Sequence, residues 1–149
     1  MTADQKIKKG MKSICIHSGP FIKSEATSSM IVDYIGDKFI AWFTGSPHPC
    51  VSLFKPIVFS DGKTVQGFDN VDYSVDYGND ATALARTLVK NYSLFVSDIK
   101  TIRDKYESDF RKLLYSDLDT KDPEQLISEC EKCFEMEKEY VEQIRSLIG

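Results

Sequence analysis

Two short cysteine and histidine pairs, Cys15-x-His17 and His48-x-Cys50, are the residues of this sequence with the clearest capacity for chemistry. Together they offer two thiolates and two imidazoles, which is a suitable ligand set for tetrahedral zinc. On a strand, however, residues i and i+2 lie roughly 6–7 Å apart, and structural zinc sites more often use longer gaps within each ligand pair. Buried thiols and hydrogen-bonded imidazoles are the commoner reason for such residues. The sequence therefore predicts neither a bound metal nor a cofactor.

The same four residues could instead supply a cysteine nucleophile with a histidine base, as Cys15 with His48 or as Cys50 with His17. Either pair needs contact between separate segments, because the two side chains have to lie within hydrogen-bond reach. A chain with two histidines has few general bases available. We assign no catalytic residue on this basis.

Cys130-x-x-Cys133 has the spacing of redox pairs and of zinc knuckles. The pair lies in the acidic stretch ECEKCFEMEKE, where neighbouring carboxylates would raise the pKa of a thiol rather than lower it. We expect core packing with one thiol partly exposed. The glutamates of this stretch and those that follow are expected to form a solvated acidic face.

The composition predicts one domain over residues 1–149. The chain is 42% hydrophobic and 28% charged with a net charge of −4, as in soluble globular proteins. A basic surface for nucleic acid is missing, and no apolar run approaches the roughly 20 residues that span a bilayer. Neither nucleic acid nor a membrane is an expected partner. Without a secretory signal pattern, we expect a cytoplasmic protein with four free thiols.

Residues 1–64 form a strand-rich half, because short β-branched and aromatic runs alternate with turn residues. A tight type II′ hairpin is expected at Gly36-Asp37. Pro56 cannot donate to a ladder, which places its strand at a sheet edge or bulge. The four predicted strands are Ser13–His17, Ser28–Ile35, Phe39–Thr44 and Val51–Phe59.

The second half is predicted to be helical over residues 80–149, after an irregular connection at 65–79. Apolar residues recur every three or four positions from Leu84 to Leu113, which indicates one long amphipathic helix with Asn79 or Asp80 as its N-cap. Asp122-Pro123-Glu124-Gln125 offers the N-cap, first-turn proline and capping box of a second helix that ends near Gly149. The fold class is therefore α+β, an antiparallel sheet followed by two long amphipathic helices that cover one sheet face.

Two ordered motifs resemble those of the secernin family, also known as the dipeptidase family C69. Residues 44–56, TGSPHPCVSLFKP, are similar to the family signature T-G-T/S-x-x-P-C-x-S-x-F-K-P. Residues 13–30, SICIHSGPFIKSEATSSM, look like the C-M-H-x-G…T-x-x-S-M segment that precedes that signature at a similar distance. The resemblance extends more loosely along the helix to about residue 115.

The resemblance implies an N-terminal-nucleophile (Ntn) hydrolase with an αββα sandwich, in which a cysteine exposed by processing attacks an amide. The matched segments belong to the last third of a full-length family member, and the nucleophile's segment is missing here. We therefore expect the C-terminal part or a split subunit of a dipeptidase-like enzyme, inactive alone. Its partner would be a larger nucleophile-bearing chain or further copies of itself. The alternative is a non-catalytic, self-associating binding or scaffold protein derived from that family.

The motif positions would then support a substrate cleft without doing chemistry. The resemblance assigns such a role to Cys15, His17, Ser29, Met30, Thr44, Gly45, Pro49, Cys50, Ser52, Phe54, Lys55 and Pro56.

Overall fold

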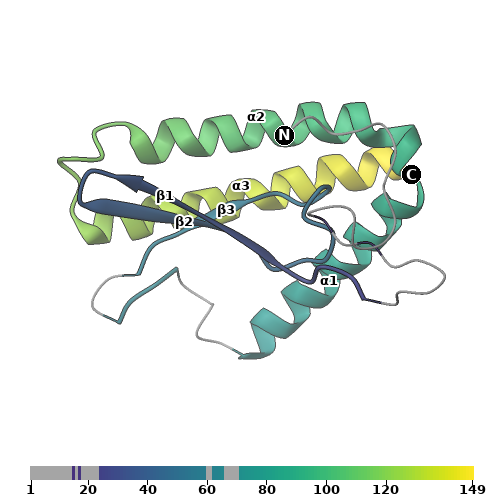
Figure 1. Cartoon of the computed structure of the whole chain (residues 1–149), viewed down its shortest axis with the longest axis horizontal. Helices are drawn as coiled ribbons and strands as arrows, with labels where there is room; N and C mark the ends of the chain where they lie inside the picture. The colour runs from purple at the N-terminus through teal and green to yellow at the C-terminus, as the bar shows by residue number, and fades with distance from the viewer. Residues whose placement is uncertain (1–14, 16, 18–23, 60–61, 66–70) are drawn as a thin grey trace.

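The computed structural model describes residues 15, 17, 24–59, 62–65 and 71–149. These residues form an α+β fold with a three-stranded antiparallel sheet and three helices, in the order βββααα (Figure 1). The α+β class and the antiparallel sheet are as the sequence predicts, but the described residues form three helices instead of two.

The first two strands, β1 (Ser29–Ile35) and β2 (Lys38–Thr44), form the predicted hairpin to within a residue at each end. Ile35 pairs with Lys38 next to the turn, and Ser29 pairs with Thr44 at the open end. Gly36 has φ +62°, as the first central position of a type II′ turn requires. The predicted strand at 13–17 lies outside the described residues, apart from Cys15 and His17.

The third strand, β3 (Lys55–Ile57), is much shorter than the predicted run Val51–Phe59. A turn precedes it, because the carbonyl of His48 accepts a hydrogen bond from the Val51 amide at 3.0 Å. Pro56 lies opposite Trp42 in a strand that pairs only with β2 among the described strands. The expectation of an edge position for Pro56 is confirmed.

The prediction of one long helix starting at residue 80 is wrong in two respects: the helix starts earlier, and the predicted stretch is divided into two helices. Helix α1 (Val71–Lys90) begins nine residues earlier and includes Gly78, and Asn91 separates it from α2 (Tyr92–Tyr115). Tertiary contact overrides the weak helix propensity at the start, since the Tyr77 hydroxyl donates to Glu137. The Asn91 amide side chain donates to the Thr87 carbonyl at 3.3 Å, which competes with regular helix bonding.

Helix α3 (Pro123–Ile148) starts as predicted. The Asp122 carboxylate accepts from the Gln125 amide at 2.8 Å, and the Gln125 side chain accepts from the Asp122 amide at 3.0 Å. This is the complete capping box, with Pro123 in the first turn.

The core lies between the sheet and the antiparallel pair α2 and α3 (Figure 1). The Trp42 indole N–H donates to the Tyr115 hydroxyl at 3.2 Å, and the two rings meet edge to face. Cys130 and Cys133 are both fully buried, so the expectation of one partly exposed thiol is wrong. Burial raises the pKa of each thiol to about 12.

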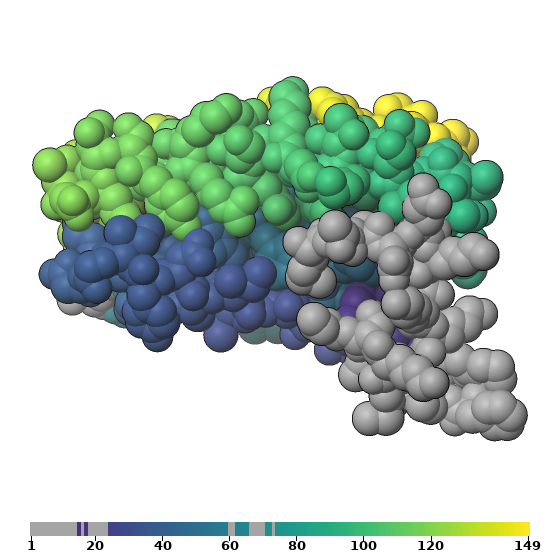
Figure 2. All heavy atoms as spheres, turned by 45° about the horizontal axis from the view of Figure 1, so that its top comes forward, coloured from purple at the N-terminus to yellow at the C-terminus, as the bar shows by residue number. Residues whose placement is uncertain are grey.

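The opposite side of the hairpin is apolar and open. Cross-strand partners share a face, so the pairs Met30–Phe43 and Tyr34–Phe39 point away from the face of Trp42. Met30, Tyr34 and Phe39 are 64%, 79% and 51% exposed. Figure 2 shows the hairpin in blue alongside α2, forming part of the molecular surface. We refer to Met30, Tyr34 and Phe39 as the outer hairpin face. Phe43 packs partly against the core, and its β3 partner Lys55 is buried against α3.

Among the helices that the structure describes, none carries an apolar stretch long enough to span a bilayer.

Candidate functional site

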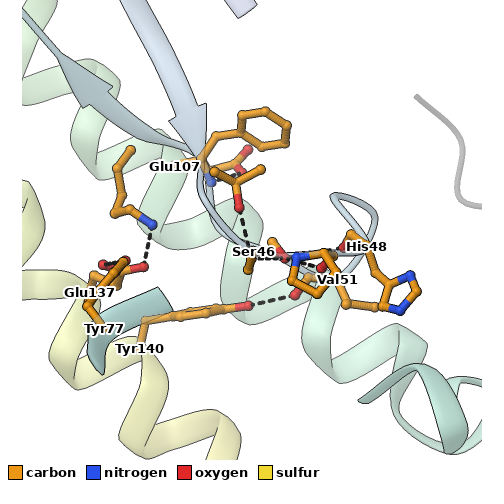
Figure 3. A network of polar contacts seen from close by, with 12 residues as sticks. Ser46, His48, Val51, Tyr77, Glu107, Glu137 and Tyr140 are labelled. Atoms are coloured by element: carbon orange, nitrogen blue, oxygen red, sulfur yellow. Dashed lines mark hydrogen bonds and ion pairs between the residues drawn. The ribbon is translucent and has the colours of Figure 1, made fainter. Parts of the chain in front are cut away.

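The loop between β2 and β3 carries most of the motif residues, and buried hydroxyl groups fix its shape (Figure 3). Thr44 and Ser46 share a hydrogen bond of 3.0 Å, and Ser46 donates to the Ser52 hydroxyl at 2.6 Å. Ser52 in turn donates to the carbonyls of Pro47 and His48 at 3.3 and 3.2 Å. Because each buried hydroxyl has a partner, this network specifies one loop conformation.

His48 lies at the tip of this loop in the left-handed region, with φ +60°. A non-glycine residue keeps such a backbone conformation where its surroundings hold it there. The His48 amide donates to the Ala26 carbonyl at 3.0 Å, and its carbonyl accepts from Val51. The His48 backbone is thereby fixed from both sides.

The loop also contacts both long helices. The Tyr140 hydroxyl of α3 donates to the Val51 carbonyl at 3.4 Å (Figure 3), and Arg103 of α2 donates to the Cys50 carbonyl at 2.8 Å. The helices therefore determine where His48 and Cys50 lie.

The structure brings the two cysteine and histidine pairs into one cluster. The sulfurs of Cys15 and Cys50 are 3.5 Å apart, and Cys50 Sγ lies 3.5 Å from His17 Nε2. The rings of His17 and His48 are stacked, with centroids 4.8 Å apart and 12° between their planes. Cys15, His17 and His48 each offer a metal-ligating atom, and these three atoms lie within 4.8 Å of one another. We call Cys15, His17, His48 and Cys50 the Cys-His cluster.

The cluster perturbs the titration of its own members. The hydrogen bond with Cys50 is the main reason that the pKa of Cys15 falls below its ordinary value. The same Cys15–Cys50 hydrogen bond, together with burial, raises the pKa of Cys50. Burial lowers the pKa of His17. Contacts within the cluster thus lower the pKa of Cys15 and raise that of Cys50, and burial favours the neutral form of His17.

Two charged residues that occupy no named motif position, Glu25 and Arg86, complete the surroundings. Glu25 Oε2 lies 3.3 Å from His48 Nε2, and its other oxygen accepts from Arg86 at 2.6 Å. The hydrogen bond from Arg86 is the main cause of a lowered pKa at Glu25. Neither residue stands out in the sequence, because the contact joins positions 61 residues apart.

Lys55 is buried and joins β3 to two of the helices. Its ammonium donates to Glu137 at 2.6 Å, and Tyr77 donates to the second oxygen of that carboxylate (Figure 3). The rings of Tyr77 and Phe134 lie 5.3 and 5.8 Å from the Lys55 nitrogen. This contact joins β3 to α1 and α3, and it lies at a groove of about 670 Å³ between those helices.

The predicted motif residues therefore fall into separate groups. Cys15, His17 and Cys50 meet in the Cys-His cluster, whereas Lys55 binds Glu137. Ser29 and Thr44 are paired at the open end of the hairpin. Gly45 follows directly, and a Cβ atom there would lie 3.1 Å from the Phe43 ring.

Comparison with protein-family models found no match for this sequence, and comparisons with curated proteins and with solved structures found none. The resemblance to the secernins therefore depends on the two sequence motifs.

Proposed function

We propose that this chain supplies the C-terminal, non-nucleophile part of a dipeptidase-like Ntn hydrolase of the secernin type. In an αββα sandwich, each sheet has helices on one face and the second sheet on the other. The observation that carries the proposal is the open outer hairpin face, which lies on the side of β1 and β2 opposite Trp42 and its contact with α2. A nucleophile-bearing sheet is the occupant that we propose for it.

The chemistry of the outer hairpin face fits that occupant. Tyr34 and Phe39 pack against each other with ring centroids 6.3 Å apart, yet both remain more than half exposed. Contiguous exposed apolar side chains of this kind mark protein interaction surfaces. Strand β1 also has an outer edge that pairs with no other described strand, and such an edge can accept a further strand.

The motif residues support a structural part in this assembly. The loop network fixes the connection between β2 and β3, and Ser29 pairs with Thr44 across β1 and β2. The Lys55–Glu137 contact holds β3 to α3. The attacking cysteine and its α-amino base would come from the partner. The reaction class is amide hydrolysis of small peptides, in a reducing cytoplasm where the four cysteines stay as free thiols.

The test is affinity purification of the tagged chain from its native cells, with the N-termini of co-purifying chains identified by mass spectrometry. We expect a larger chain whose first residue after processing is cysteine. Tyr34→Lys combined with Phe39→Lys should abolish its capture, because both side chains belong to the proposed interface. Leu94→Lys is the matched control, since Leu94 is 72% exposed on α2 and should leave capture unchanged.

Light scattering on the purified chain tests the alternative, a self-associating scaffold protein without catalytic activity. A stable dimer that the Tyr34 and Phe39 substitutions dissociate, with no cysteine-initiated partner, would mean that a second copy covers the outer hairpin face. That result would contradict the hydrolase proposal and support a self-associating scaffold protein. A monomer without any partner would also contradict it.

A further inference from the structure

The Cys-His cluster gathers metal-ligating side chains from two distant segments, and the proposed hydrolase function makes no use of them. Cys15 and His17 precede the sheet, whereas His48 and Cys50 lie in the loop after β2. We propose that these four residues bind one Zn²⁺ ion in a structural site that fastens the segment of Cys15 and His17 to the loop.

The distances within the cluster are close to those that zinc requires. A tetrahedral ion with Zn–S of about 2.3 Å and Zn–N of about 2.0 Å separates two sulfur ligands by about 3.8 Å and a sulfur from a nitrogen by about 3.6 Å. The observed separations are 3.5 Å between Cys15 Sγ and Cys50 Sγ and 3.5 Å between Cys50 Sγ and His17 Nε2. The ligating atoms of Cys15, His17 and His48 lie within 4.8 Å of one another, so on zinc binding they have to approach by up to about 1.5 Å. Cys50 joins them through its contacts with Cys15 and His17.

His48 has the outer partner that a zinc-binding histidine usually has. Its Nε2 contacts the Glu25 carboxylate at 3.3 Å, while its Nδ1 is buried and has no hydrogen-bond partner among the described residues. The His48 side chain is 4% exposed. Coordination through Nδ1 would leave Nε2–H on Glu25, which is the carboxylate–histidine–metal arrangement that fixes ring orientation. Arg86 holds Glu25 from its other oxygen.

The donor set selects zinc and a structural role. Two thiolates and two imidazoles in tetrahedral geometry suit Zn²⁺, and four protein ligands leave no position open for substrate. The two thiolate charges balance the charge of the ion, and any thiol proton is released to solvent on binding. Burial agrees with a largely closed site, because Cys15, His17 and His48 are 7%, 4% and 3% exposed and Cys50 is partly buried.

A direct test uses the full chain, reduced and stripped of metal with a chelator, and then titrated with Zn²⁺ against a chromogenic chelator. We expect one equivalent of zinc per chain and a rise in melting temperature as zinc is added. Titration with Co²⁺ should give the absorption of tetrahedral cobalt with thiolate charge transfer. These measurements on the unaltered chain decide the question even where a variant fails to fold.

Variants then assign the ligands. Cys50→Ser should weaken zinc binding at least about 100-fold, because one of four ligands is lost. Glu25→Gln should weaken it roughly 10–100-fold through His48. Cys133→Ala and Glu124→Gln are the controls: the first removes a buried thiol outside the cluster, and the second changes an exposed carboxylate that pairs with Lys63. Both should bind zinc as the wild type does.

Several results would overturn the proposal. These are zinc uptake well below one equivalent, a cobalt spectrum without thiolate ligation, or unchanged affinity in Cys50→Ser. Rapid formation of a Cys15–Cys50 disulfide in a glutathione buffer, in a chain that takes up no zinc when reduced, would make the cluster a redox pair instead. Fast alkylation of Cys15 that stoichiometric zinc does not slow would point to a nucleophile.

Discussion

Loss of the buried Lys55–Glu137 pair should destabilise the fold strongly. The two side chains are 4% and 9% exposed, and they are joined by a 2.6 Å contact. In Lys55→Met, the Glu137 carboxylate would stay buried and lose the cation that balances it. Removal of one partner of a buried pair costs about 3–5 kcal/mol. In a chain of 149 residues, each kcal/mol lowers the melting temperature by roughly 2–4 °C.

The double variant Lys55→Met with Glu137→Leu separates the charge effect from the packing effect. Apolar replacement of both members of a buried ion pair is often neutral or stabilising. Tyr77 would lose its acceptor, at a cost of about 1–3 kcal/mol if water does not replace it. The double variant should therefore be more stable than either single variant.

The assay is urea unfolding followed by the fluorescence of Trp42, the one tryptophan, which is 2% exposed in the fold. Lys63→Met is the matched control, because Lys63 pairs with Glu124 where the side chains are 66% and 80% exposed. An exposed pair contributes only about 0–1 kcal/mol. The reasoning would be refuted if Lys55→Met cost less than about 1 kcal/mol, or if the double variant were no better than the worse single one.

Three further predictions concern pH, thiol reactivity and helix capping. Burial raises the pKa of Glu107 above its usual 4.5, so the free energy of unfolding should fall as pH rises from 4.5 through the raised pKa. Urea unfolding of Glu107→Gln should lack this fall. The same pH dependence in wild type and variant would contradict the raised pKa of Glu107. Cys130 and Cys133 should resist alkylation at pH 8 until the chain unfolds, because both are buried with pKa values of about 12; labelling at the rate of a free thiol would disprove their burial. Asp122→Ala should cost about 1 kcal/mol in thermal unfolding through the lost capping box, whereas exposed Asp119→Ala should cost almost nothing.

Local signals account for the elements that the sequence predicts well. Gly36 supplies the positive φ of the hairpin turn, and Asp122 with Gln125 defines the start of α3. Pro56 indicates its edge position because it lacks an amide proton. Each of these features depends on residues within a few positions of one another, so one sequence is enough to find them.

Contacts between distant segments account for the rest. The start of α1 is stabilised by Tyr77 meeting Glu137, 60 residues away, so propensity at 71–79 gives the wrong element. The break at Asn91 is instead local: its side chain donates to the carbonyl of Thr87, four residues earlier, and the apolar stripe continues unchanged through the break, so its period gives no sign of it. The four members of the Cys-His cluster are visible in the sequence, but on a strand the two residues of each pair would lie too far apart to share a metal ion. Their meeting depends on the loop turn at His48 and on Arg103, 53 residues from Cys50.

The central proposal, a non-nucleophile part of a dipeptidase-like hydrolase, is tested most directly by dipeptide hydrolysis measured on the chain alone and on the complex purified with it. We predict no hydrolysis by the chain alone, and hydrolysis by the complex that is lost when the partner's N-terminal cysteine is alkylated. Activity in the chain alone that disappears in Cys15→Ser would contradict the account. A complex that cleaves no dipeptide would contradict it equally.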